Sequence, residues 1–153
     1  MKVLFHLATT TAPVCTTSPN TWFETSATMP LQCSNYTIDT DITRDVAYTN
    51  VSNLCDNTAP FGVKPIWFRF EVPGGTMIAN YSIPNGRCGT SAPGWYAGQY
   101  PSSTYTTATS IACYMAAGNL CYYCNLMSVT NCNTFFVFAL PKSPTCSLRH
   151  CTM

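Results

Sequence analysis

Ten cysteines in 153 residues are the feature that most restricts what this chain can fold into. They are spread along the sequence, at Cys15, Cys33, Cys55, Cys88, Cys113, Cys121, Cys124, Cys132, Cys146 and Cys151. Proteins of the reducing cytosol rarely carry so many cysteines unless they bind metal, whereas secreted domains use them as disulfides. The even number predicts complete pairing, although a sequence alone does not reveal which cysteines pair. We therefore predict an extracellular domain that all ten cysteines hold together.

Charge is unusually scarce in this chain, and this excludes two kinds of partner. Charged residues make up 8% of the sequence and the net charge is +1, against roughly 25% charged residues in a typical soluble domain. The few basic residues are scattered, whereas nucleic acids and anionic membrane surfaces are bound by clustered basic residues. No apolar run approaches the ~18–20 residues that span a bilayer. We expect neither a nucleic-acid partner nor a membrane span.

Three N-glycosylation sequons support the extracellular prediction. They begin at Asn35, Asn50 and Asn80, each followed two residues later by Ser or Thr. Attached sugar would also supply the solubility that so few charges cannot. The sequence therefore predicts a secreted or cell-surface glycoprotein, whose partners are other extracellular glycoproteins or glycan-binding proteins.

Short β-type runs between turn signals predict a mainly β fold. Residues 66–72 and 134–140 are the clearest strands, and the uniform apolarity of the second predicts burial on both faces. Residues 106–114 and 126–130 are weaker strand candidates, whereas residues 110–120 favour a short helix. Together these patterns predict a disulfide-stapled antiparallel β domain with small α content and long loops.

The first 32 residues differ from the rest, because they are rich in Thr, Ser and Pro. They begin with the apolar stretch Lys2, Val3, Leu4, Phe5, His6 and Leu7. This stretch is short for a signal peptide and contains a histidine, so we interpret it as a strand retained in the chain. It either completes the sheet of its own domain or adds to the sheet edge of a neighbouring copy. Head-to-tail addition would build a filament, with the chain itself as partner in a homopolymer.

From Cys33 to Cys151 the sequence resembles a known family. The resemblance rests on "CSNYT" at 33–37, "WFRFEVPGGTM" at 67–77, "CGTSAPGW" at 88–95, "IACYMAAGNLCYYC" at 111–124 and "VTNCNTFFVFALPKSPTCSLRHC" at 129–151. These motifs are similar to the cysteine-rich domain of uromodulin, of the major zymogen-granule membrane glycoprotein and of a liver-specific zona-pellucida protein. The resemblance implies an extracellular, glycosylated, non-enzymatic recognition or adhesion module. In some members a high-mannose glycan acts as a decoy for bacterial adhesins, but this chain places its sequons at other positions.

Two departures from the family pattern concern the cysteines. Ser82 stands where the family has a cysteine, which would leave one partner unpaired, and Cys15 restores the even count. An adjacent cysteine pair of the family is also spread out here as Cys121 and Cys124. We therefore predict an N-terminal segment, residues 1–32, stapled through Cys15 onto a cysteine-rich domain, residues 33–153.

Three sequence features have alternative functional interpretations. Trp95, in a Gly- and Pro-rich stretch, is either an exposed platform for sugar or part of the scaffold, and we favour packing onto a disulfide core. Cys121-x-x-Cys124 is half of a zinc site, a redox pair or two structural cysteines, and the even cysteine count favours structural disulfides without metal. The acids Asp39, Asp41 and Asp45 lack the glycine and terminal Glu of a calcium loop, so we interpret them as a solvated turn.

A hydrolase is the remaining alternative, with His150 as its base. That role requires a nucleophile and an orienting acid near the imidazole, and the sequence singles out neither. We predict that the protein is not an enzyme and uses no cofactor.

Overall fold

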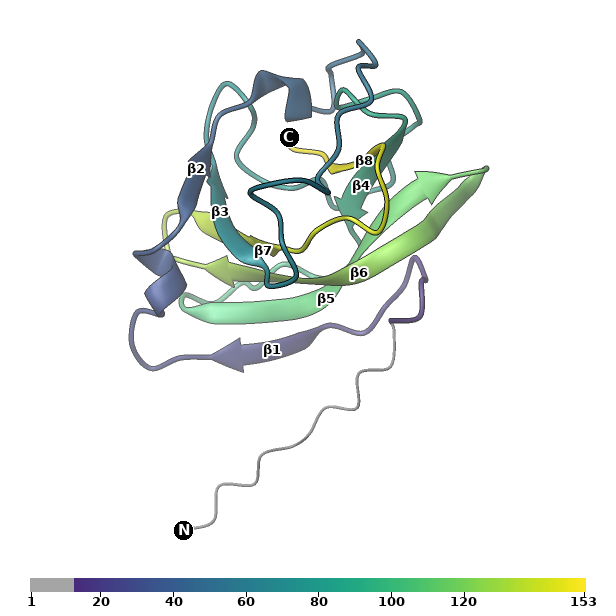
Figure 1. The fold of residues 1–153 in the computed structure, drawn as a ribbon. Helices are drawn as coiled ribbons and strands as arrows, with labels where there is room; N and C mark the ends of the chain where they lie inside the picture. Colours follow the sequence, from purple (N-terminus) through teal and green to yellow (C-terminus); the bar gives the residue numbers. More distant parts are fainter. Residues whose placement is uncertain (1–12) are drawn as a thin grey trace.

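A long β-hairpin lies in the middle of the sheet and runs along the lower side of the view in Figure 1. The computed structural model describes residues 13–153, in which β5 (Thr106–Ala116) pairs with β6 (Asn119–Asn131) along nearly its whole length. The turn between them is Ala117-Gly118, and both residues have positive φ, 48° and 75°, as a tight hairpin turn requires. The predicted helix at residues 110–120 is therefore wrong, because this segment is the end of β5, the turn and the start of β6.

The other strands join this hairpin in one eight-stranded sheet that curls on itself (Figure 1). Most neighbours are antiparallel, and the parallel exceptions are β2–β3 and β4–β8. Along the sheet the order is β2 (Thr37–Asp39), β3 (Ile66–Phe70), β7 (Phe136–Leu140), β6, β5, β4 (Ala92–Tyr96) and β8 (Leu148–His150). β1 (Trp22–Thr25) lies off this path and pairs with β5.

The mainly β prediction is confirmed, although the helical content of the described residues consists of two single turns of 3₁₀ helix, η1 (Leu31–Cys33) and η2 (Ile42–Arg44). The strand predicted at residues 66–72 is present as β3 but ends at Phe70. The predicted double-sided burial of residues 134–140 holds for β7, where Val137, Phe138, Ala139 and Leu140 are all buried. None of the helices in residues 13–153 is long and apolar enough to cross a bilayer.

The main core lies inside the curl of the sheet. One face of β3 contributes Phe68 and Phe70, whose rings pack at a centroid distance of 6.4 Å. Phe138 from β7 and Met127 and Val129 from β6 close the same cluster. These side chains alternate along their strands, because only every second residue of a strand faces the interior.

Five disulfides cross-link the described residues, and no cysteine is free. Four of them join residues at least 63 positions apart in sequence. The bonds are Cys15–Cys124, Cys33–Cys132, Cys55–Cys146, Cys88–Cys151 and Cys113–Cys121. Each long-range bond restricts the unfolded chain and so contributes roughly 2–4 kcal/mol to stability.

The N-terminal segment is attached to the sheet at two places. The disulfide Cys15–Cys124 joins it to β6, and β1 pairs Trp22 with Thr109 of β5. The predicted apolar strand Lys2–Leu7 lies outside the described residues. A domain boundary between residues 32 and 33 stays a prediction.

We expect the double variant Cys15→Ser/Cys124→Ser to keep its fold but to lose about 2–4 kcal/mol of unfolding free energy, because the bond closes the longest loop in the chain. Urea unfolding of the oxidised protein measures the loss. A loss below about 1 kcal/mol would show that the pairing of β1 with β5 alone holds the segment.

Candidate functional site

The asparagines of the three sequons all lie on the surface of the protein. Asn35 follows η1, Asn50 lies in the loop between η2 and β3, and Asn80 lies in the loop between β3 and β4. All three residues are exposed. Each sequon therefore presents its asparagine to solvent, where a glycan would project away from the protein.

The loops that carry Asn50 and Asn80 are fixed to the framework. Beside Asn50, the Cys88 N–H donates to the Tyr48 carbonyl at 3.0 Å. Beside Asn80, the Ala79 N–H donates to the Cys151 carbonyl at 2.9 Å. Because Cys88 and Cys151 are joined to each other, one disulfide holds both of these anchor points.

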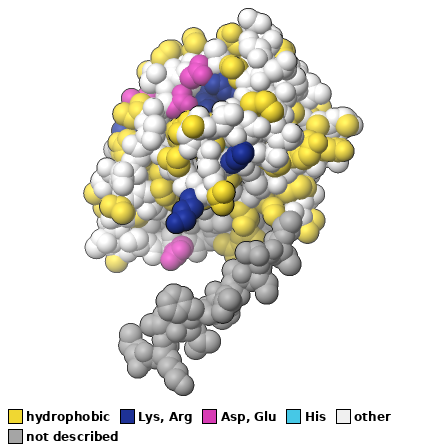
Figure 2. Space-filling view, in the orientation of Figure 1, with side chains coloured by type: hydrophobic (Ala, Val, Ile, Leu, Met, Phe, Trp, Pro, Cys, Tyr) yellow, Lys and Arg dark blue, Asp and Glu magenta, His cyan; other side chains and the backbone are white. Residues whose placement is uncertain are grey.

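The surface of the protein carries few charges. On the face that Figure 2 shows, the charged side chains are few, acidic and basic ones lie side by side near the top, and apolar and neutral polar atoms cover most of the area. Two of the seven basic residues, Arg44 and Arg149, are buried in the protein.

Trp95 is a scaffold residue, as predicted from the sequence. It lies in β4, where all five residues are buried, and only 6% of its surface is exposed. Its indole N–H donates to the Leu120 carbonyl at 3.1 Å, and its ring packs in a cluster with four disulfide cysteines. Beside it, a Cβ on Gly94 would lie 2.6 Å from the Tyr114 ring, so the glycine permits this close approach.

The two cysteines of Cys121-x-x-Cys124 have different partners. Cys121 is bonded to Cys113 across the hairpin, and Cys124 is bonded to Cys15 of the N-terminal segment. In this oxidised structure they therefore form neither a redox pair nor half of a zinc site.

The structure brings an acid to His150 that the sequence did not identify. His150 Nδ1 lies 2.8 Å from the Asp56 carboxylate, and His150 Nε2 lies 2.9 Å from the Tyr114 hydroxyl. An ionised carboxylate only accepts hydrogen bonds, so Nδ1 carries the proton that faces Asp56. Asp56 and His150 are 94 residues apart, and no local motif connects them.

This chain of polar groups resembles a catalytic arrangement but is sealed. His150, Asp56 and Tyr114 are 0%, 1% and 0% exposed. A substrate would have no route to the imidazole, so the arrangement fits a structural role.

Arg44 completes the cluster by forming a bidentate ion pair with Asp56. Its two terminal nitrogens lie 3.0 and 2.8 Å from the carboxylate oxygens. Burial alone would raise the pKa of Asp56, but the Arg44 guanidinium and the His150 hydrogen bond hold that pKa well below its usual range. Burial likewise acts to lower the pKa of Arg44, and the carboxylates of Asp56 and Asp39 outweigh it and raise the pKa.

Asp39, Asp41 and Asp45 are interpreted from the sequence as a solvated turn; Asp41 is indeed exposed, but two of the three carboxylates also form ion pairs that the sequence did not predict. Asp39 binds Arg44 at 2.8 Å, and Asp41 binds Arg149. Asp41 also accepts the Thr43 N–H at 2.9 Å and so caps η2. Two of the three carboxylates are therefore neutralised by buried arginines.

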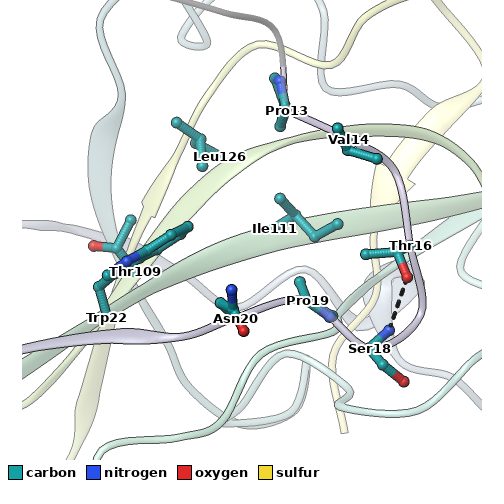
Figure 3. A pocket seen from close by; sticks show the side chains of 10 residues that line it. All are labelled: Pro13, Val14, Thr16, Ser18, Pro19, Asn20, Trp22, Thr109, Ile111 and Leu126. Atoms are coloured by element: carbon teal, nitrogen blue, oxygen red, sulfur yellow. Dashed lines mark hydrogen bonds between the residues drawn. The ribbon is translucent and has the colours of Figure 1, made fainter.

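A hollow of about 520 Å³ lies on the outer face of the hairpin (Figure 3). The segment from Pro13 to Asn20 forms one wall, and β1, β5 and β6 form the rest. Its lining contains no acid, base, histidine or cysteine: Pro13, Val14, Thr16, Ser18, Pro19, Asn20, Trp22, Thr109, Ile111 and Leu126. Sequence reasoning missed this hollow, because its walls come together only through tertiary contacts.

Comparison with known proteins agrees with the sequence resemblance. A family model described as a uromodulin-like domain matches residues 68–152. The pancreatic secretory granule membrane major glycoprotein GP2 of dog is 34% identical over 121 residues, which is 78% of this chain and 23% of that protein. Rat uromodulin is 34% identical over 87 residues, 56% of this chain and 14% of the relative. The chain therefore spans less than a quarter of the length of these two relatives.

Replacement of Asp56 tests the buried cluster. We expect Asp56→Asn to lose about 3–5 kcal/mol of unfolding free energy, because the buried Arg44 guanidinium would lose its fully buried bidentate partner and keep only its ion pair with Asp39. The folded pKa of Asp56 lies below its usual value of 3.8, so its carboxylate stabilises the fold above pH 3.8 and this contribution is lost as the pH falls towards the folded pKa.

Unfolding measured from pH 6 down to pH 2 checks both effects. The exposed Glu24→Gln is the matched control and should behave as the wild type. A variant Asp56→Asn as stable as the wild type, with the same acid dependence, would contradict this role.

Proposed function

The chain belongs to the uromodulin-like cysteine-rich domain family, and from this premise we propose that it is an extracellular, non-enzymatic module that presents N-linked glycans for recognition or adhesion. The observation that carries the proposal is the placement of Asn35, Asn50 and Asn80, which are all exposed on a disulfide-bonded framework. Five disulfides fit an extracellular location.

Rigid attachment points support glycan presentation. Because a glycan is itself flexible, its binding to a partner costs conformational entropy. This cost is smaller when the asparagine that carries the glycan is already held in place. The loops of Asn50 and Asn80 are both hydrogen-bonded to residues of the Cys88–Cys151 disulfide. The small number of charges also supports glycan presentation, because a neutral surface neither attracts nor repels a partner that binds the glycan.

Two sites of the structure were candidates for catalysis, and the features of both argue against it. The Asp56–His150–Tyr114 cluster is buried, and the hollow on the hairpin lacks any titratable side chain. The partners are therefore proposed to be glycan-binding proteins or other extracellular glycoproteins. The similar dog protein is itself named a major glycoprotein, which agrees with this assignment.

Removal of each sequon from protein secreted by animal cells tests the proposal. We expect Asn35→Gln, Asn50→Gln and Asn80→Gln each to lower the intact mass by one glycan, and the triple variant to lose capture by glycan-binding lectins while it remains folded. Ser82→Thr keeps the third sequon and should leave its glycan in place, whereas Ser82→Ala should remove it. Wild-type protein without any glycan, or lectin capture that survives in the triple variant, would contradict glycan presentation.

A second candidate function is self-assembly into an extracellular filament, and the open edge of β6 favours it. On β6, β7 pairs only with Ser128–Asn131, so the part of β6 from Asn119 to Met127 has β5 as its sole strand partner among the described elements. Leu120 and Tyr122 are exposed there. An added strand, such as Lys2–Leu7 of another copy, would extend the sheet at this edge.

Negative-stain imaging of the unreduced protein, with light scattering on the same sample, tests assembly. Filament formation predicts regular fibres in full-length protein that disappear when residues 1–12 are deleted. Monodisperse monomer at all concentrations would remove this second candidate.

A further inference from the structure

The hollow on the outer face of the β5–β6 hairpin takes no part in glycan presentation, and we propose that it holds the apolar segment Val3–Leu7 of the same chain. None of the three sequon asparagines lines the hollow. The inference goes beyond glycan presentation and does not depend on it, and it is the alternative to the filament candidate, which assigns Lys2–Leu7 to another copy.

The walls of the hollow expose large apolar side chains that lie close together. Val14, Trp22 and Leu126 are 82%, 61% and 49% exposed, whereas Ile111 at the floor is 4% exposed. Figure 3 shows Trp22 and Leu126 on one side and Val14 on the other, with Ile111 between them. Single exposed apolar residues are ordinary, but a cluster around a concave surface is typical of a binding site.

The chain leads directly from the hollow into the segment proposed to fill it. Pro13 lines the hollow, and twelve residues precede it. Residues 8–12, "ATTTA", are as long as a common hairpin loop of about 4–5 residues, so residues 3–7 can return along residues 14–20. Such a short connection gives a high effective concentration, in the millimolar range for flexible linkers.

The sequence of the segment matches the chemistry of the walls. In a strand, Val3, Phe5 and Leu7 share one face, and Lys2, Leu4 and His6 share the other. The first face is entirely apolar and fits walls that carry no charge. The two basic groups lie on the second face, where they would remain in solvent.

The backbone beside the hollow is also available for pairing. Among the residues the structure describes, the N–H groups of Val14, Cys15 and Thr16 donate no hydrogen bond to other backbone groups. The disulfide Cys15–Cys124 fixes this run against β6. A returning strand can therefore add main-chain hydrogen bonds to its apolar contacts.

Hydrogen exchange of residues 1–12 at neutral pH, read by mass spectrometry on the oxidised protein, tests the proposal. We expect these amides to exchange at least about tenfold more slowly than in the free peptide 1–12, because docked strands are protected. Leu126→Glu, which places a charge in the hollow, should abolish the protection. Leu31→Glu is the matched control, since Leu31 is also an exposed leucine, lies in η1 and does not line the hollow.

Concentration dependence separates the same chain from a neighbouring copy. Docking within one chain predicts protection that is constant from nanomolar to micromolar protein, with a monomeric mass throughout. Protection that rises with concentration and accompanies larger species would assign the segment to another copy and overturn the proposal. Free-peptide exchange rates in the wild type, or protection that persists in Leu126→Glu with an unchanged core, would overturn it as well.

Discussion

The carboxylate of Asp56 is the interaction on which the loop half of the molecule depends. It lies within hydrogen-bond distance of the Arg44 guanidinium, the backbone N–H of His150 and the His150 imidazole. The other nitrogen of the imidazole is hydrogen-bonded to the hydroxyl of Tyr114 in β5. A single buried acid thus joins η2, the loop before β3, the last strand and the central hairpin. Since a buried charge without partners is so costly, we expect displacement of any one of these elements to destabilise the others.

The disulfides extend this arrangement to loops that hydrogen bonds alone could not order. Residues 45–65 contain no strand. The disulfide Cys55–Cys146 holds this loop directly, and Cys88, which is bonded to Cys151, holds it near the Asn50 sequon through a hydrogen bond to the Tyr48 carbonyl. Long loops cost conformational entropy on folding, and covalent links remove much of that cost from the unfolded side. The framework can therefore carry exposed sequons on irregular backbone without flexible display arms.

Burial of charge and exposure of neutral groups together explain the sparse electrostatics of the surface. Arg44 and Arg149 are used inside the protein, which leaves few charges outside to direct association. Under the proposed function, recognition depends on attached sugar, whereas apolar contact is concentrated at the hollow between Trp22 and Leu126. The two surfaces are separate, since the sequon asparagines do not line the hollow, and so they can serve different interactions.

The sequence by itself determined the class of the protein and much of its framework. The cysteine motifs identified the family, the runs 66–72 and 134–140 predicted β3 and β7, and the composition around Trp95 was correctly interpreted as scaffold. These features depend on local residue types or on spacing, which a sequence displays directly. The helix predicted at residues 110–120 failed because an alanine-rich stretch has no strong strand signal, and pairing with β6 overrode its propensity.

Only the tertiary structure decided which distant groups meet. The sequence around Cys15 does not identify Cys124 as its partner, and the sequence around Asp56 does not identify His150. Partners about a hundred residues apart are brought together by the path of the whole chain. The same holds for the hollow, whose walls come from the N-terminal segment and from β5 and β6. Local sequence specifies strands and turns through short-range sterics and periodicity, whereas a buried ion pair or a cavity exists only after the sheet has curled.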